Sequence, residues 1–467
     1  MRGRPDGYSR AEMRTIMRPG TKYSVIGRNA FPGPGGFTGV AWMEFTCGID
    51  DRPGLASLLI FGLQWLAVSV PIILIIGKVV AGLDTGGPAI PYLQKLFLLV
   101  ALVMLAQIYL GHRLPLVLGP ATVLLIGILA SLDAGSGAIN AATLIGGLLL
   151  AGLAATGLFR HLKDLFTPRV IAVVLMLIAF TLAPTILGLI TDGGGAVPAT
   201  QTFLFSLAFA FALFIANGIL RGIWRSTLAF SAIVIGTPVY AALFGAVPLP
   251  PADTALFALP GDLVAPLAVP GAGVLAAFLI CYLALATNDL GSIQSVGGLL
   301  GAGAMDGRVN RGVVVTGLGN IAAGLTGVIG PVNFSLSPGV IAATGCASRF
   351  ALVPAAVALG LLAASPLAIG YLGSIPGPVI GVVLTYVMAS QIAAGLMLGQ
   401  EKGAVRTFDD GLIIGIPLLL GTLAAFLPGA VAAGFPATLR PLITNGFVVG
   451  VIVVLVLEHI VYRRPRG

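Results

Sequence analysis

Long apolar stretches, each separated from the next by a short polar connection, run through most of this chain. A stretch of about 20 apolar residues is long enough to cross the hydrocarbon core of a bilayer as an α-helix. Such stretches predict spans near 57–80, 89–110, 114–132, 138–158, 169–190, 200–218, 223–244, 270–290, 312–329, 333–345, 350–370, 375–398, 411–428 and 439–461. We therefore expect an all-α polytopic membrane protein with about 14 transmembrane segments.

The basic residues are distributed unevenly among the connections. Arginines and lysines gather before the first apolar stretch, after the last one and in every second loop between them, whereas the other loops carry mainly aspartates. Cytoplasmic loops of membrane proteins are enriched in Arg and Lys. Both termini are thus expected in the cytoplasm, with an even number of spans, in the cell (inner) membrane.

Seven of the predicted spans precede a loop rich in Pro and Leu, and seven follow it. We expect five regions: a cytoplasmic N-terminal segment 1–54, a first seven-span repeat 55–245, an extracytoplasmic loop 246–269, a second seven-span repeat 270–462 and a basic cytoplasmic tail 463–467. Because each half has an odd number of spans, the second half is inverted relative to the first. Such inverted repeats are typical of secondary transporters.

Proline and glycine interrupt the apolar pattern once in each half. The first half contains LPLVLGPATVLL, with Gly119 and Pro120, and the second contains GPVNFSLSPGVIAATG, with Pro338 and Gly339. Interrupted helices at matching positions of two repeats leave backbone groups free near the bilayer midplane, where a solute can bind. Pro and Gly also kink helices that merely pack together. Polar residues around the second break, which favour a binding site, are Asn333, Ser335 and Ser337.

The composition fits lipid rather than water as the surrounding solvent. Hydrophobic residues make up 57% of the 467 positions and charged residues 9%, against about 25% charged residues in a soluble domain. The net charge of +8 is concentrated in flanking clusters, so we do not expect nucleic acid as a partner. The sequence contains no Walker A motif, catalytic triad, paired carboxylates or CxxC pattern. We therefore expect no enzyme activity, no cofactor and no metal site.

One carboxylate, Asp289 in CYLALATNDLGSIQSVGG, is expected at membrane depth. Ionisable groups inside a membrane are costly and usually functional. Asp289 is therefore a candidate for coupling to a cation, H⁺ or Na⁺. The alternative is an aspartate at a helix end that pairs with a loop cation. The histidines, which lie near span ends in basic surroundings and suggest neither a metal ligand nor a catalytic base, are His112, His161 and His459.

Three segments resemble the motifs of one transporter family. SLSPGVIAATGCASRF (335–350) and GSIPGPVIGVVLTYVMASQIAAG (373–395) resemble the signature region of the nucleobase–ascorbate transporters, or xanthine/uracil permeases. GIDDRPGLASLLIFGLQW (48–65) is similar to the opening segment of the same family. The resemblance implies a secondary active transporter for a solute such as uracil, xanthine or another purine, driven by a proton or cation gradient through alternating access.

The resemblance also implies a 7+7 inverted-repeat fold. In this fold a core domain, spans 1–4 and 8–11, moves against a gate domain, spans 5–7 and 12–14. Spans 3 and 10 would each consist of a short extended strand followed by a half-helix, and the substrate would lie between spans 8 and 10, facing span 3. The implied partners are a small-molecule solute, the lipid bilayer and a second copy of the chain in a homodimer.

The family's motifs carry over to individual positions. The residues implied to line the substrate site are Asn288, Ser292, Phe334, Ser335, Leu336, Ser337, Thr122, Val123 and Tyr386. Two of these positions depart from the family, because Asn288 replaces a glutamate and Leu336 replaces a glutamate or glutamine. Each lost hydrogen-bond acceptor should weaken discrimination among bases by about 1–3 kcal/mol. The resemblance therefore predicts the fold of this chain more firmly than the identity of its substrate.

Two alternatives to a nucleobase transporter follow from these departures. Sulfate and bicarbonate transporters share the 7+7 architecture and bind anions at half-helix N-termini, whose dipoles favour negative charge. A site without carboxylates suits an anion, although no Arg or Lys lies in the second break. A non-transporting receptor or scaffold is the other alternative, and it would have no need of paired broken helices.

Overall fold

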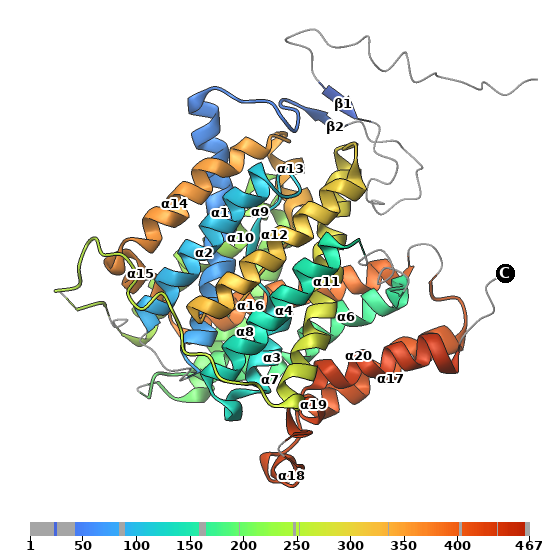
Figure 1. The fold of residues 1–467 in the computed structure, drawn as a ribbon. Helices are drawn as coiled ribbons and strands as arrows, with labels where there is room; N and C mark the ends of the chain where they lie inside the picture. Colours follow the sequence, from blue (N-terminus) through green and yellow to red (C-terminus); the bar gives the residue numbers. More distant parts are fainter. Residues whose placement is uncertain are drawn as a thin grey trace, which may run out of the picture.

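The structure of the protein is a computed structural model. It describes residues 23–25, 43–83, 89–157, 165–195, 197–245, 249–251, 253–334, 336–400, 404–436 and 438–462. The basic tail expected at 463–467, most of the segment expected at 1–54 and Ser335 lie outside the described residues. In the described part, the chain is mostly helical (Figure 1).

The first half of the chain places one short strand among its helices. Its elements are β1 (Tyr23–Val25), β2 (Met43–Phe45), α1 (Leu55–Ala81), α2 (Ala89–Tyr109), β3 (Leu118–Pro120), α3 (Thr122–Leu129), η2 (Leu132–Ala134), α4 (Ser136–Ala155), α6 (Pro168–Thr181), α7 (Ala183–Thr191), α8 (Ala199–Ile219), α9 (Ile223–Ser226) and α10 (Leu228–Phe244). The expected strand and half-helix of span 3 are therefore present as β3 and α3.

The second half repeats this order. Its elements are α11 (Ala272–Leu299), α12 (Met305–Thr326), β4 (Pro331–Asn333), α13 (Ser337–Thr344), η4 (Arg349–Leu352), α14 (Val353–Ala363), α15 (Pro366–Gly373), α16 (Gly377–Gln400), α17 (Phe408–Ala425), α18 (Gly429–Ala433), α19 (Arg440–Ile443), α20 (Gly446–Val456) and the π-helical turn η6 (Leu457–Val461). As in the first half, two long helices precede a strand and an eight-residue half-helix.

The two short strands pair with each other across the middle of the molecule. β3 and β4 run antiparallel, with Leu118 opposite Asn333, Gly119 opposite Val332 and Pro120 opposite Pro331. Because the strands are antiparallel, α3 and α13 leave the pair at opposite ends. The breaks expected from proline and glycine in the two halves thus meet in space.

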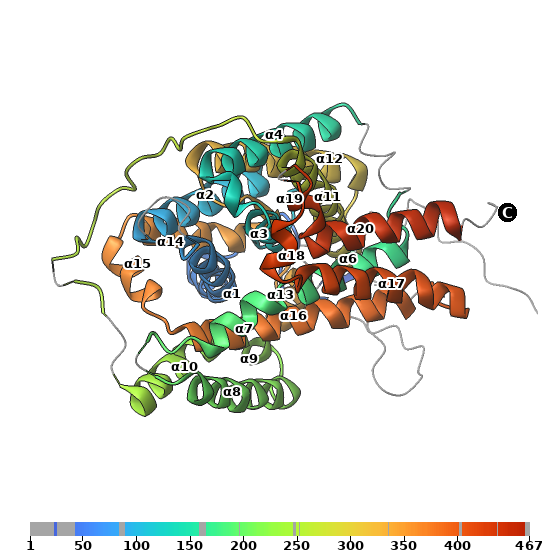
Figure 2. The ribbon, with the colours of Figure 1, turned by 90° about the horizontal axis from the view of Figure 1, so that it is seen from below.

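The helices form two groups that match the expected core and gate domains. In the core, α4 packs on α12, α2 on α14, and α11 on both α3 and α4. In the gate, α16 packs on α6, α7, α8 and α10, while α17 packs on α20 and α6. Figure 2 shows α2, α4, α12 and α14 in one part of the molecule and α8, α16 and α17 in another. The expected fold class is confirmed.

The number of spans is not confirmed by helix length. Among the described residues, eight helices are long and apolar enough to cross a membrane, or nine when the bent pair Arg349–Ala363 and Pro366–Gly373 is counted as one span. The other expected spans coincide with half-helices, with the more polar α12, or with the shorter helices α10 and α20. The expected count of about 14 segments is therefore not confirmed, because several of the expected spans are short or broken.

The span expected at 350–370 shows how local sequence breaks a helix. α14 and α15 meet at an angle of 93°. Ser365 is extended and its hydroxyl accepts a hydrogen bond from the backbone N–H of Ala368, so it caps α15. The proline that follows, Pro366, disfavours a helical conformation at Ser365. The bend therefore follows from a serine–proline pair inside an apolar stretch.

Glycines bring α4 and α12 into direct backbone contact. A Cβ atom added at Gly147 would lie 2.7 Å from the backbone N of Ile321 and 2.8 Å from the backbone O of Gly317. A Cβ atom at Gly324 would lie 2.6 Å from the backbone O of Asn140. Small residues let transmembrane helices approach closely, and packing is the main attraction between helices in lipid.

Replacing Gly147 with alanine should therefore destabilise the core. The added methyl group meets backbone atoms that cannot rotate away, and such overpacking costs about 1–3 kcal/mol. Thermal unfolding of the purified protein in detergent measures the effect. The matched control is Gly152→Ala in the same helix, where an added Cβ meets no atom within 4 Å. Equal unfolding temperatures for the two variants would contradict the predicted backbone contact.

Candidate functional site

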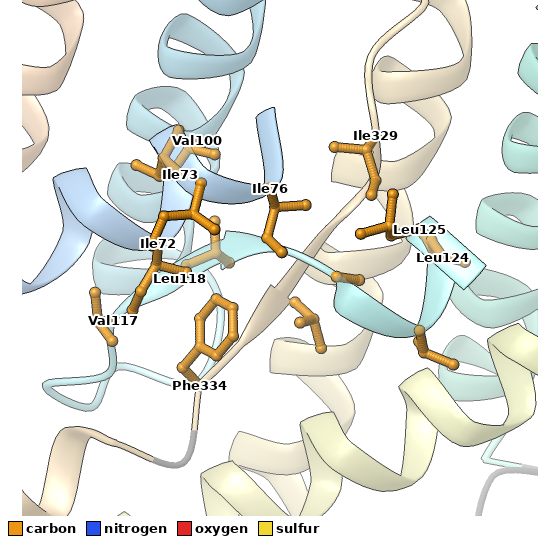
Figure 3. Packing of buried hydrophobic residues seen from close by; sticks show 14 of the residues in the cluster. Ile72, Ile73, Ile76, Val100, Val117, Leu118, Leu124, Leu125, Ile329 and Phe334 are labelled. Carbon is orange, nitrogen blue, oxygen red and sulfur yellow. The ribbon is translucent and has the colours of Figure 1, made fainter. Parts of the chain in front are cut away.

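The paired strands β3 and β4 form the floor of the candidate site. Phe334 follows β4 directly, is buried, and lies against β3, beside Val117, Leu118 and Ile72 (Figure 3). A Cβ atom on Gly119 would lie 2.7 Å from Cε2 of Phe334, so only glycine leaves room for the ring. This close approach explains why the first break needs a glycine at this position.

Asn333, the last residue of β4, is the centre of a buried hydrogen-bond network. Its backbone N–H and its Nδ2 both donate to Oδ1 of Asp289, at 3.0 and 2.6 Å. Its backbone O accepts hydrogen bonds from Nδ2 of Asn288 (3.3 Å) and from Oγ of Ser292 (3.0 Å). Three residues of α11 therefore hold the end of β4.

Asp289 is fully buried, with 0% of its surface exposed. Besides the two bonds from Asn333, its Oδ2 accepts a hydrogen bond from Oγ1 of Thr316 on α12, at 2.8 Å. The alternative expectation, an aspartate at a helix end, is wrong, because residue 289 lies well inside α11. A buried charge in lipid needs such partners. The structure thus gives Asp289 a positioning role, and its coupling role stays a prediction.

His112 belongs to the same network, which the sequence analysis did not anticipate. It follows α2, is fully buried, and its Nε2 lies 3.2 Å from Oδ1 of Asn333. Because its Nδ1 accepts a hydrogen bond from the backbone N–H of Leu114 (3.0 Å), a neutral ring carries its proton on Nε2 and donates to Asn333. The sequence indicated only a position near a span end in basic surroundings, because a contact with a residue 221 positions away has no local sequence signal.

The remaining candidates on the half-helices take different positions. Ser337 is fully buried: its Oγ accepts from the backbone N–H of Val117 (2.9 Å) and donates to the backbone O of Phe334 (3.2 Å). Thr122 and Val123 are buried in the first turn of α3. Leu336, by contrast, is 41% exposed. Ser337 therefore stabilises the strand pair, whereas Leu336 offers an apolar surface.

Tyr386 lies in the gate. Its hydroxyl donates a hydrogen bond to Oδ1 of Asn217 on α8, at 3.0 Å, and its ring lies 6.1 Å from that of Phe214. The same Asn217 oxygen accepts from Nε of Arg225 at 3.2 Å. Tyr386 thus joins α16 to α8, on the opposite side of the core–gate boundary from Asn288, Ser292 and Phe334.

Neither half-helix beside the strand pair has a side-chain cap at its N-terminus. The first N–H groups of a helix have no partner within the helix, and its dipole is positive at this end. The N-termini of α3 and α13 therefore offer hydrogen-bond donors to an acceptor atom of a ligand. A carbonyl oxygen or an anionic oxygen fits this arrangement.

Asp289 is not the only buried carboxylate among the described residues. In the gate, Asp410 and Glu458 are both buried and both contact the guanidinium group of Arg169. Glu458 accepts a hydrogen bond from Nη2 of Arg169 through Oε1 at 2.9 Å, and its Oε2 lies 2.9 Å from Nε of Arg169 in an ion pair. This cluster ties α6 to α17 and η6, so Arg169 is a structural residue rather than a loop cation.

Comparison with known proteins gives one family over most of the chain. The sequence model of the Permease family, named Xan_ur_permease, matches residues 56–430. The "Putative purine permease CPE0397" of Clostridium perfringens is 27% identical over 334 residues, which cover 69% of this chain and 72% of that protein. The xanthine permease XanQ of Escherichia coli is 28% identical over 162 residues, 34% of each chain.

Solved structures agree on the fold. The transmembrane domain of a cyanobacterium bicarbonate transporter, BicA, superimposes with a TM-score of 0.57 at 16% identity, covering 79% of this chain and 96% of that one. At this identity the similarity concerns the arrangement of the helices and strands alone.

Proposed function

Since the chain belongs to the Permease family matched above, we propose that it carries a nucleobase of the uracil, xanthine or purine class across a membrane by alternating access. The protein is a multi-pass membrane transporter and not an enzyme. One observation carries the proposal: β3 pairs with β4, which brings an uncapped half-helix from each half of the chain to one place.

The proposed substrate lies over the strand pair, between the core and the gate. Phe334 supplies an aromatic surface beside a planar base, since offset stacking of rings is favourable. The N–H groups at the starts of α3 and α13 donate to the carbonyl oxygens of the base. Thr122 and Val123 line the first wall, and Leu336 with Ser337 the second. Further proposed contacts come from Asn288, Ser292, Ser335 and, across the boundary, Tyr386.

The proposed coupling residue is Asp289, with H⁺ or Na⁺ as the ion. Its carboxylate accepts hydrogen bonds from the end of β4 and from α12. A proton on the carboxyl group would remove an acceptor from this network and shift the balance among its bonds. Because Phe334 follows β4 directly, a change at Asp289 would reach the surface that the base contacts.

Orientation and assembly also belong to this proposal. The arginine-rich loops would face the cytoplasm, with both termini on that side of the inner membrane. The gate exposes apolar side chains on α8, including Leu204, Phe211 and Ile215. These side chains face either lipid or the gate of a second copy, and a homodimer through the gate is proposed.

Uptake into proteoliposomes tests the proposal. The purified protein, reconstituted with an imposed pH gradient, should accumulate radiolabelled uracil or xanthine above the equilibrium level. Empty liposomes and a collapsed gradient provide the controls. Sulfate and bicarbonate form a second arm. The fold similarity to a bicarbonate transporter and the lack of a carboxylate at positions 288 and 336 of this chain favour an anion as the second candidate. Accumulation of an anion and of neither base would refute the nucleobase assignment.

A further inference from the structure

A basic pocket opens at the end of the core where the arginine-rich loops meet, away from the strand pair. It has a volume of about 380 Å³. Four segments build it: the stretch before α1, the connection from α2 to β3, the start of α12, and η4. Its lining residues are Asp50, Arg52, Arg113, Ala304, Arg308, Arg311, Arg349 and Phe350.

Five guanidinium groups surround this space against a single carboxylate. That carboxylate, Asp50, pairs with Arg349 at 2.8 Å and is mostly exposed. Five positive charges and one negative charge leave a net charge of +4 on the lining residues. Like charges repel, so gathering five arginines around one cavity is unfavourable without an anion.

Backbone carbonyl oxygens hold the arginines in place. Nη1 of Arg308 donates to the backbone O of His112 (2.9 Å) and of Arg113 (2.8 Å). Nε of Arg113 donates to the backbone O of Tyr109 at 2.9 Å. The guanidinium groups of Arg52 and Arg349 stack on the ring of Phe350, 4.9 and 4.6 Å from its centroid. These contacts orient the guanidinium groups before any ligand arrives.

Two residues of the pocket also have an unusual backbone conformation. Arg113 (φ 56°) and Ala304 (φ 54°) are two of the three non-glycine residues with positive φ in the described part of the chain. Such conformations cost about 1–3 kcal/mol each and cluster at functional sites. Ala304 also begins α12 without a side-chain cap, so the positive end of a long helix points at the pocket.

We propose that this pocket binds a phosphate-bearing anion. Arginine is suited to phosphate because its planar fork donates two parallel hydrogen bonds to two phosphate oxygens. Small-molecule sites have volumes of about 300–1,000 Å³, so the pocket has room for a phosphate ester rather than only a bare ion. Two sources carry this chemistry: the headgroup of an anionic phospholipid and a soluble phosphate ester.

The pocket is linked to the strand pair through one residue. Arg308 binds the backbone O of His112, and the ring of His112 binds Asn333 at the end of β4. An anion bound by Arg308 would therefore change the restraint on the connection that carries His112. The site offers a route by which a phosphate compound regulates transport.

Titration with inorganic phosphate tests the binding. Thermal unfolding of the delipidated protein in neutral detergent gives an apparent Kd, with sodium chloride at matched ionic strength as the reference. We expect phosphate to stabilise the wild type and the double variant R52Q/R311Q to bind at least tenfold more weakly. The matched control is Arg221→Gln, which removes one exposed guanidinium outside the pocket and should leave the Kd unchanged.

Lipid retention distinguishes the two sources. If the ligand is a lipid headgroup, native mass spectrometry of protein from nanodiscs should show that the wild type retains phosphatidylglycerol but not phosphatidylcholine. The R52Q/R311Q variant should lose the bound phosphatidylglycerol. Stabilisation by phosphate without lipid retention identifies a soluble ester. If the glutamine variant does not fold, R52K/R311K replaces it, with an expected three- to tenfold loss because lysine lacks the fork. The proposal is overturned if the wild type responds to neither probe, or if both double variants bind like the wild type.

Discussion

Replacing Asp289 with asparagine should abolish accumulation driven by a pH gradient while leaving a folded transporter. The asparagine Oδ1 can still accept the two hydrogen bonds that Asn333 donates. Its side chain carries no charge and cannot exchange a proton. Exchange of labelled for unlabelled base across the membrane should persist, because it needs no ion gradient. We expect at least a tenfold fall in the accumulation ratio, measured in proteoliposomes with and without the gradient.

Two further substitutions separate coupling from folding at this position. Asp289→Ala leaves the donors on Asn333 and Thr316 buried without an acceptor, at about 1–3 kcal/mol for each lost bond. That variant should be unstable in detergent, whereas Asp289→Asn should not. Asp253→Asn, in an exposed loop, is the matched control and should behave as wild type. Gradient-driven accumulation by Asp289→Asn at the wild-type level would show that Asp289 only positions β4.

Replacing Arg169 with methionine should have the largest effect on stability. The substitution leaves Asp410 and Glu458 buried without their shared cation. Removing one partner of a buried ion pair costs about 3–5 kcal/mol, because the remaining buried charge has lost its counter-ion. The loss should appear as a lower unfolding temperature and a lower yield of monodisperse protein in detergent.

The chain provides a matched control for this substitution. Arg440 pairs with Asp133 at 3.3 Å, but the Asp133 side chain is 82% exposed. An exposed pair contributes about 0–1 kcal/mol, so Arg440→Met should change the unfolding temperature little. The triple variant R169M/D410N/E458Q should recover much of the lost stability, since no buried charge remains. If R169M and R440M lose the same stability, the buried cluster does not tie the gate helices together.

The sequence was informative where a single segment determines its own structure. Proline next to glycine interrupts the apolar pattern at Gly119–Pro120 and at Pro338–Gly339, so both breaks could be located without coordinates. Their matching positions in the two halves indicated a shared binding site, and the structure adds that the two strands pair. The same reasoning placed Asp289 inside an apolar stretch, although not the partners that hold it.

Contacts between distant segments could not be predicted in this way. His112 and Arg169 both stand in basic loops of the sequence, and nothing local distinguishes them from solvated cations. Their partners, Asn333 and Glu458, lie 221 and 289 positions further along the chain. Ser337 shows a related limit: a polar side chain beside free backbone groups can bind a substrate or the backbone itself, and the sequence does not show that the Ser337 hydroxyl contacts the backbone of Val117 and Phe334.

The glycine contacts between α4 and α12 restrict how such a molecule can change shape. Because the backbones of α4 and α12 are in direct contact, neither helix can slide along the other without steric clashes. The core must therefore move as a rigid body, together with the strand pair and any bound substrate. Relative displacement then falls on the contacts between the two groups, among them the two places where α3 meets α6 and α13 meets α9. Cross-links between α3 and α6 or between α13 and α9 should stop transport, whereas cross-links between α4 and α12 should leave transport unchanged.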